Sequence, residues 1–216
     1  MESHKPKQTS TVYHLKHHVK KLLHDDTDDS YMKILPFLQL FKKQNVGAVV
    51  ALEVDSVHRF MQCFMASPVA SMACGQNGSC KKVLGADGTH YRHPKYNGVL
   101  LSMHTIDGNG RTMLVAVTIV PVESEQHWHW FFNLCKNSGV YFEDKVLFVD
   151  RDKGSIAAGL QMAMEGTQLN MRWCTQHILR NCINKLGVST NDVQFRAYVF
   201  ALQASKSILE HRKHMK

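Results

Sequence analysis

Short apolar runs separated by turn residues predict a series of strands in the middle of the chain. The runs are Val83–Ala86, Val99–Ile106, Met113–Val120, Val146–Val149 and Met171–Trp173. The sequence Asp-Gly-Asn-Gly at 107–110 joins the second run to the third and is typical of a hairpin turn. The first three strands are therefore expected to be consecutive and antiparallel.

Helical spacing of apolar residues alternates with the later strands. The predicted helices are Ser124–Leu134, which Ser124 would cap, Ser155–Glu165, His177–Leu186, which Gly187 would end, and Val193–Leu209. Three strands followed by alternating helices and strands predict an α/β fold, in which helices cover a mixed sheet.

The first 80 residues form less regular patterns. Residues 1–30 read as a basic tail with a short helix, and residues 31–80 as a helical and strand lead-in. Within the lead-in we expect a helix over Tyr31–Gln44, a strand over Val46–Val54, a strand or short helix over Val57–Met65, and a loop over Ser71–Cys80.

Composition narrows the class of protein. A chain of 216 residues with 44% hydrophobic residues can bury one full core, and its formal charge of +8 favours a polyanionic partner. No apolar segment reaches the length of about 20 residues that a membrane span needs, and no leader is evident, so a soluble protein that is not secreted is expected. The six cysteines show no dense spacing and read as reduced thiols.

Two aspartates follow predicted strands at corresponding positions. Asp87 comes directly after Val83–Ala86, and Asp150 directly after Val146–Val149. A carboxylate at the end of a buried strand has a fixed backbone and a side chain at the rim of the sheet. Alternatively, Asp87-Gly88 is an ordinary turn dipeptide, and Asp150 pairs with Arg151 or caps the following helix.

Four motifs in order resemble those of a known family. They are Asp-Gly-Thr at 87–89, Glu-Ser at 123–124 before a Trp-bearing helix, Asp-Arg-Asp-Lys-Gly at 150–154, and Cys-Thr-Gln-His at 174–177. Together they resemble the catalytic domain of a Mutator-like element (MULE) transposase, of the ribonuclease H-like, DDE-type superfamily. The resemblance extends over about residues 31–209, and it implies a ribonuclease H-like core.

The resemblance assigns roles to individual residues. Asp87 and Asp150 would be the first two catalytic acids and would hold Mg²⁺ or Mn²⁺. Asp152 is the alternative second acid, although capping the next helix fits it better, and Glu123 would support the site. Cys174 and His177 would be a supporting pair, because structural zinc there would need two further ligands that the spacing does not identify.

The family's third acid, a glutamate, has no assigned counterpart. Glu210 lies where the helical insertion of the family would begin, so the third acid is left unknown. The expected organisation is a basic tail and helix (1–30), a lead-in (31–80), the MULE core (81–187) and the start of a truncated helical insertion (188–216).

The resemblance implies DNA transposition by metal-dependent strand cleavage and transfer, with DNA as partner and no membrane association. We expect this chain to be a truncated or inactive copy of such a transposase, located in the nucleus or the cytoplasm. A homo-oligomer is compatible with the family. The alternative is a domesticated, non-catalytic protein that binds DNA or regulates transcription.

Overall fold

The computed structural model describes residues 31–92 and 97–215, so the tail and helix predicted for residues 1–30 lie outside the described residues. Its helices are α3 (Ile34–Gln44), α4 (Pro68–Ala73), α5 (Glu125–Asn137), α6 (Lys153–Met164), α7 (Thr175–Leu186), α8 (Val193–Ala204) and α9 (Ile208–His214). Its strands are β1 (Val49–Val54), β2 (Phe60–Ala66), β3 (Val83–Arg92), β4 (Asn97–Ile106), β5 (Thr112–Val120), β6 (Val146–Val149) and β7 (Asn170–Trp173).

The strands form one mixed sheet in the order β1-β2-β5-β4-β3-β6-β7. In this order, the first five strands, from β1 through β2, β5 and β4 to β3, each pair antiparallel with the next. Strand β6 pairs parallel with β3, and β7 pairs parallel with β6. The part from β5 to β7 is the ribonuclease H-like arrangement, with the first strand of the core beside the fourth. The predicted fold class is therefore confirmed, and β1 and β2 extend the sheet on its antiparallel side.

Strand β3 is longer than its sequence predicts. The expected strand ends at Ala86, but β3 pairs with β4 from Leu84 to Arg92, and Asp87 lies opposite Ser102. The interpretation of Asp87-Gly88 as a turn, and of Asp87 as lying past the strand end, is therefore wrong. Local propensity disfavours Asp and Gly in strands, but continuous pairing with a long neighbouring strand overrides it.

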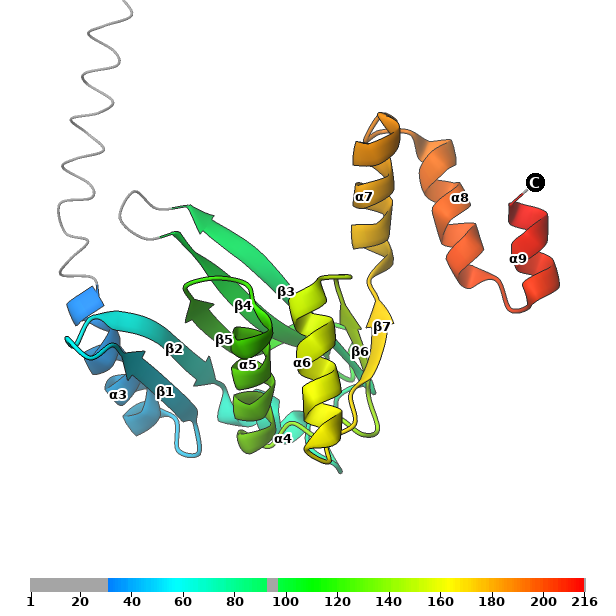
Figure 1. The fold of residues 1–216 in the computed structure, drawn as a ribbon. Coiled ribbons are helices and arrows are strands. Elements are labelled where there is room, and N and C mark those ends of the chain that lie inside the picture. Colours follow the sequence, from blue (N-terminus) through cyan, green and yellow to red (C-terminus); the bar gives the residue numbers. More distant parts are fainter. Residues whose placement is uncertain (1–30, 93–96, 216) are drawn as a thin grey trace, which may run out of the picture.

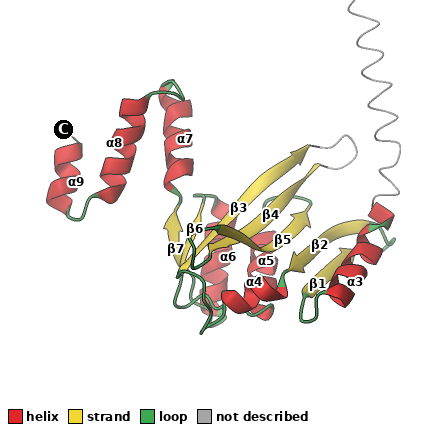
Figure 2. Cartoon of the chain, turned by 180° about the vertical axis from the view of Figure 1, so that it is seen from behind, coloured by secondary structure: helices red, strands yellow, loops and turns green. Residues whose placement is uncertain are grey.

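Helices α5 and α6 lie side by side on one face of the sheet (Figure 1), and the view from behind shows the opposite face of the strands (Figure 2). The aromatic residues Trp128, Phe131 and Phe132 of α5 are buried in the core. Trp128 stacks on Phe132 with ring centroids 5.4 Å apart. These rings fill the interior, as the helical spacing predicts, and are not available to stack on nucleobases.

The structure defines two segments between α3 and β3 more closely than the sequence does. The segment predicted as strand or short helix is strand β2, and its buried Phe64 contacts Trp130 and Phe131 of α5. The predicted loop over Ser71–Cys80 starts within helix α4, which Ser67 caps, so the loop is shorter than expected.

The last three helices form an arm that extends from the end of β7 (Figure 1). The single helix predicted over Val193–Leu209 is wrong, because α8 ends at Ala204 and α9 begins at Ile208. Ser207 accepts a hydrogen bond from the backbone N–H of Glu210 and caps the new helix. Neither α8 nor α9 contributes a buried residue.

Candidate acidic site

The sheet places Asp87 on β3 and Asp150 directly after the neighbouring parallel strand β6. The register pairs Gly85 of β3 with Phe148 of β6, and the two aspartates each lie two residues further along. Because side chains alternate between the faces of a strand, both aspartates lie on the face opposite the buried Leu84. Two carboxylates that are distant in sequence are therefore brought to one edge of the sheet, namely the edge at which the interior strand β6 ends beside β3.

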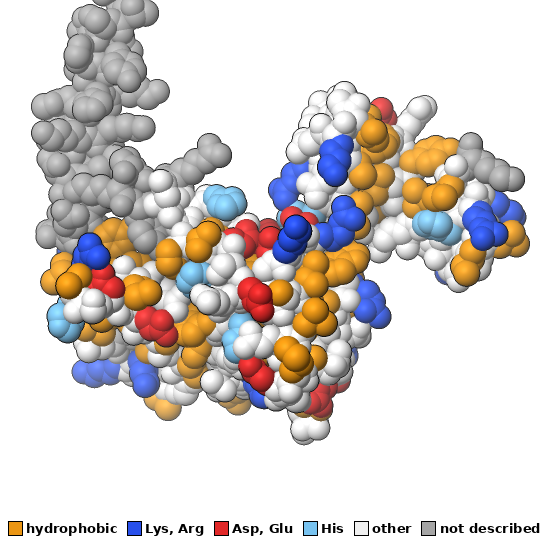
Figure 3. Space-filling model, in the orientation of Figure 1, with side chains coloured by type: hydrophobic (Ala, Val, Ile, Leu, Met, Phe, Trp, Pro, Cys, Tyr) orange, Lys and Arg blue, Asp and Glu red, His pale blue; other side chains and the backbone are white. Residues whose placement is uncertain are grey.

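A cavity of about 310 Å³ lies at this edge. Its lining residues are Asp87, Gly88, His90, Glu123, Asp150, Arg151, Asp152, Arg180 and Asn181. Four of these nine residues carry carboxylates, and two carry guanidinium groups. Figure 3 shows acidic side chains gathered beside the helical arm, with Lys and Arg side chains next to them. The site is therefore strongly charged with both signs present.

Glu123 precedes α5 and reaches toward β3. Its Oε1 lies 2.9 Å from the position that a Cβ would take at Gly88, so the glycine leaves room for this carboxylate. Glu123 accepts a hydrogen bond from Nε1 of the buried Trp128 at 3.2 Å. Burial raises the pKa of Glu123, and the charges of Asp152 and Asp87 add to that rise, whereas the Trp128 bond opposes it.

The two acids of the Asp-Arg-Asp motif have different local partners. Asp150 Oδ1 accepts a hydrogen bond from the backbone N–H of Arg151 at 2.6 Å. Asp152 is the N-cap of α6, and its Oδ2 accepts from the backbone N–H of Ser155 at 3.0 Å. The helix-capping contact expected for Asp152 is thus present, and it leaves Asp150 as the residue that directly follows β6.

The pair Cys174 and His177 lies where β7 passes into α7. Cys174 is the N-cap residue of α7, and His177 lies on the first turn, with a side chain only 13% exposed. His177 Nε2 lies 3.5 Å from Asp87 Oδ1, and the buried Nδ1 of the same ring has no hydrogen-bond partner. The chain therefore places His177 directly beside Asp87.

Sequence reasoning missed Arg180 and Asn181 as residues of this site. They lie three and four residues after His177 on α7, so they share its face of the helix. That spacing was the available signal. Glu210, in contrast, lies on α9 and is not among the residues that line the cavity; its carboxylate accepts from the backbone N–H of Lys206.

The donor set suits a hard divalent cation. Carboxylate oxygens are the ligands that Mg²⁺ prefers, and one or two protein carboxylates commonly suffice because water and substrate phosphates complete the shell. Across residues 31–92 and 97–215, no three His, Cys, Asp or Glu side chains lie close enough to hold one ion. Within the same residues no four-ligand zinc set forms around Cys174 and His177, and Asp87 and Asp150 line one cavity as a pair of carboxylates.

These strands and motifs coincide with a known domain. Residues 83–181 match the MULE transposase domain. The match begins at the first residue of β3, ends within α7, and contains every residue that lines the acidic cavity. The MULE resemblance of the sequence is thus confirmed over this range. No curated protein matches the chain.

Solved structures give weaker similarities. A chain in the cryoEM structure of the simian T-cell lymphotropic virus intasome, in complex with PP2A regulatory subunit B56 gamma, is 10% identical with a TM-score of 0.33. The match covers 66% of the present chain and 57% of that chain. The HTLV-2 integrase catalytic core domain with magnesium, in its dimeric form, is 13% identical with a TM-score of 0.31, over 58% of the present chain and 89% of that chain. Similarity of this extent carries no information about substrate.

No helix in the described part of the chain combines the length and the apolar character needed to cross a membrane. All six cysteines, which lie in that part, are free thiols.

Proposed function

We propose that the MULE domain of this chain is built to cleave and transfer DNA strands with Mg²⁺ or Mn²⁺, and that Asp87 and Asp150 are two of its three catalytic acids. The third acid stays unassigned, so cleavage by this chain is expected to be weak or absent unless a third ligand joins the two aspartates. The observation that supports it best is the placement of Asp87 on β3 and of Asp150 at the end of the neighbouring parallel strand β6, at one cavity and within the MULE match. A bound divalent ion would supply Lewis-acid activation of the phosphodiester group and of the attacking oxygen.

The residues of the chain have separate tasks in this proposal. Asp87 and Asp150 hold the ion by their carboxylates, and Glu123 adds negative charge from the other side of β3. His177 orients Asp87 through the contact of 3.5 Å. Asp152 fixes the start of α6, and thereby the backbone that carries Asp150.

The test is metal-dependent nicking of supercoiled plasmid DNA. Asp87→Asn and Asp150→Asn should each abolish nicking in Mg²⁺ and in Mn²⁺, because an amide cannot supply the charge that balances the ion. The matched control is Asp107→Asn. Asp107 accepts backbone hydrogen bonds in the turn between β4 and β5, at the opposite end of the sheet, and an Asn side chain can accept them as well.

Wild-type rates in both site variants would contradict the assignment of the two acids. A wild-type chain that binds DNA but nicks it with neither metal would instead support the second candidate, a non-catalytic DNA-binding protein derived from a transposase. The basic helical arm described below is the observation in favour of that candidate.

We further propose that residues 81–187 are the catalytic unit and that the helices after Gly187 form a separate segment. Gly187 has φ of 65° and ends α7 in the left-handed conformation that glycine accommodates best. The MULE resemblance favours the nucleus as the compartment of this activity, with the cytoplasm as the alternative.

A further inference from the structure

We propose that Arg180 is a phosphate-positioning residue, and that Arg196 continues the same contact with the DNA backbone beyond it. This inference rests on the proposed function for the identity of its ligand, DNA. The site concerned is separate from the acids: it consists of the face of α7 that carries Arg180 and of the cavity between α7 and α8.

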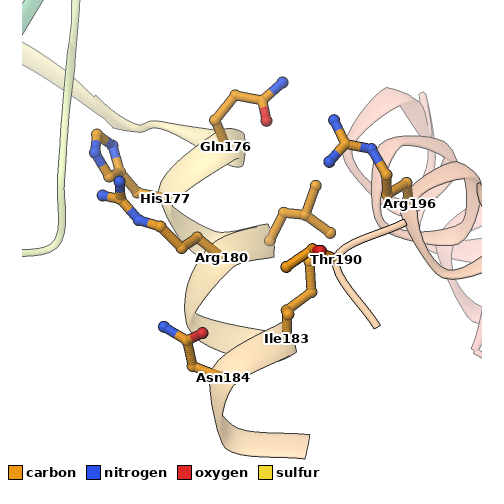
Figure 4. Close-up of a pocket in the computed structure, with 8 residues that line it drawn as sticks. Gln176, His177, Arg180, Ile183, Asn184, Thr190 and Arg196 are labelled. Atoms are coloured by element: carbon orange, nitrogen blue, oxygen red, sulfur yellow. The ribbon is translucent and has the colours of Figure 1, made fainter. Parts of the chain in front are cut away.

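Arg180 occupies a unique place among the described arginines, because it lines both cavities. It belongs to the acidic cavity with Asp87 and Asp150, and also to a second cavity of about 280 Å³ between α7 and α8. In Figure 4, Arg180 and His177 project from the same side of α7. Its exposed guanidinium forms no ion pair or hydrogen bond with any residue of 31–92 or 97–215.

Arg196 lies across the second cavity from α7. It projects from α8 toward α7 (Figure 4), and within the described residues it too has no ion-pair partner. The arm as a whole is basic. Its charged residues are Arg180, Lys185, Arg196, Lys206, Arg212 and Lys213 against Asp192 and Glu210. A polyanion that passes from the arm to the acids therefore meets Arg196 first and Arg180 next.

The chemistry at the acids requires such a cation. A phosphodiester that approaches four carboxylates is repelled, and a planar guanidinium can hold its non-bridging oxygens with two parallel hydrogen bonds. Arg180 is the lining residue of the acidic cavity that also lines the cavity between α7 and α8. The competing explanation is that Arg180 merely offsets the charge of the acids, which requires no ligand.

DNA binding of the full chain separates the two explanations. The probe is a fluorescein-labelled 25-base-pair duplex of arbitrary sequence, measured by anisotropy between 50 and 200 mM KCl in EDTA, so that neither metal nor cleavage enters. The variants are Arg180→Gln, Arg196→Gln and Arg180→Lys. The matched control is Arg111→Gln, which removes the same charge at the turn between β4 and β5, where the side chain lines neither cavity.

Each glutamine variant at 180 or 196 should weaken binding on the order of five- to tenfold at 50 mM KCl. Each should also reduce the slope of log K against log salt by about 0.9, because one phosphate contact is lost. Arg180→Lys should keep the slope and recover part of the affinity, since the charge stays and the fork is lost. Arg111→Gln should match the wild type.

Two results would overturn the proposal. One is a slope for Arg180→Gln equal to that of Arg111→Gln, which is the outcome that simple charge balance predicts. The other is a wild-type chain that does not bind the duplex at 50 mM KCl. Plasmid nicking is a separate measurement. If all variants keep the wild-type salt slope of duplex binding and the wild type nicks DNA with metal, only the arginine contacts are rejected. If the glutamine variants have reduced salt slopes and the wild type does not nick DNA, only the catalytic function is rejected.

Discussion

At the scale of single residues, the acidic edge of the sheet concentrates like charges. Glu123 lies close to Gly88 of β3 and shares its surroundings with Asp152 and Asp87. The protein holds this carboxylate against Trp128 rather than leaving it in solvent. Burial and the neighbouring carboxylates together make its ionised form costly, which has a measurable effect on stability.

The effect concerns the pH dependence of folding. Because the pKa of Glu123 is raised, chiefly by burial and next by Asp152, the folded chain binds this proton more tightly than the unfolded chain. The associated stability is present below the ordinary pKa of the group and is lost as the pH rises through the raised pKa. Glu123→Gln should therefore be more stable than the wild type at pH 7, with a smaller difference or none at pH 4.

Urea unfolding at the two pH values measures this difference in the free energy of unfolding. Glu125→Gln, on the exposed first turn of α5, is the matched control and should show no such gain, because an acid near a helix N-terminus is favourable there. A Glu123→Gln variant whose advantage is equal at pH 4 and pH 7 would show that the carboxylate is not the source.

At the scale of elements, the start of α6 controls where Asp150 lies. The strand β6 ends at Val149, and the helix begins only three residues after Asp150. Asp152 closes this short connection, because its side chain satisfies a backbone N–H of the first helical turn. The connection is therefore defined by a cap and not by a buried side chain.

Removing that cap should lower stability. Asp152→Ala should reduce the free energy of unfolding by about 1 kcal/mol, whereas Asp152→Ser should retain most of it, because serine is an equally good N-cap. Chemical denaturation of both variants measures the loss. Equal stabilities of the alanine and serine variants would show that the hydrogen bond to Ser155 contributes nothing.

At the scale of the whole molecule, the chain divides into a packed sheet and an arm. The buried residues of the main hydrophobic core run in sequence from Phe64 on β2 to Leu169, the residue before β7. In the described residues beyond β7, which end at Met215, only Leu179 and Ile183 of α7 are buried, and α8 and α9 have no buried residue. Most apolar side chains of the arm are thus half-buried or exposed.

Hydrogen exchange followed by mass spectrometry should reveal this division. Backbone amides of α8 and α9 should exchange faster than those of β3, β4 and β6, because local opening there exposes little apolar surface. A DNA duplex that occupies the arm should slow exchange in α8. Protection of α8 and α9 equal to that of the central strands in the free chain would contradict the division.

Much of this architecture can be predicted from the sequence, because local patterns specify it. Alternating and β-rich runs give the strands from β4 onward, Ser124 gives the start of α5, and Gly187 gives the end of α7. Where Gly or Asp interrupts a pattern, prediction fails: β3 continues through Asp87-Gly88 because β4 pairs with it, and that partner lies beyond any local window.

The sequence by itself determined the order of elements, the two aspartates and the family motifs, since each depends on residues close together along the chain. Only the tertiary structure decided which charged groups meet. Register places Asp87 level with Asp150, Gly88 leaves room for Glu123, and α7 brings His177 and Arg180 to the same edge. These meetings depend on strand pairing and helix placement over long separations, which no local pattern encodes.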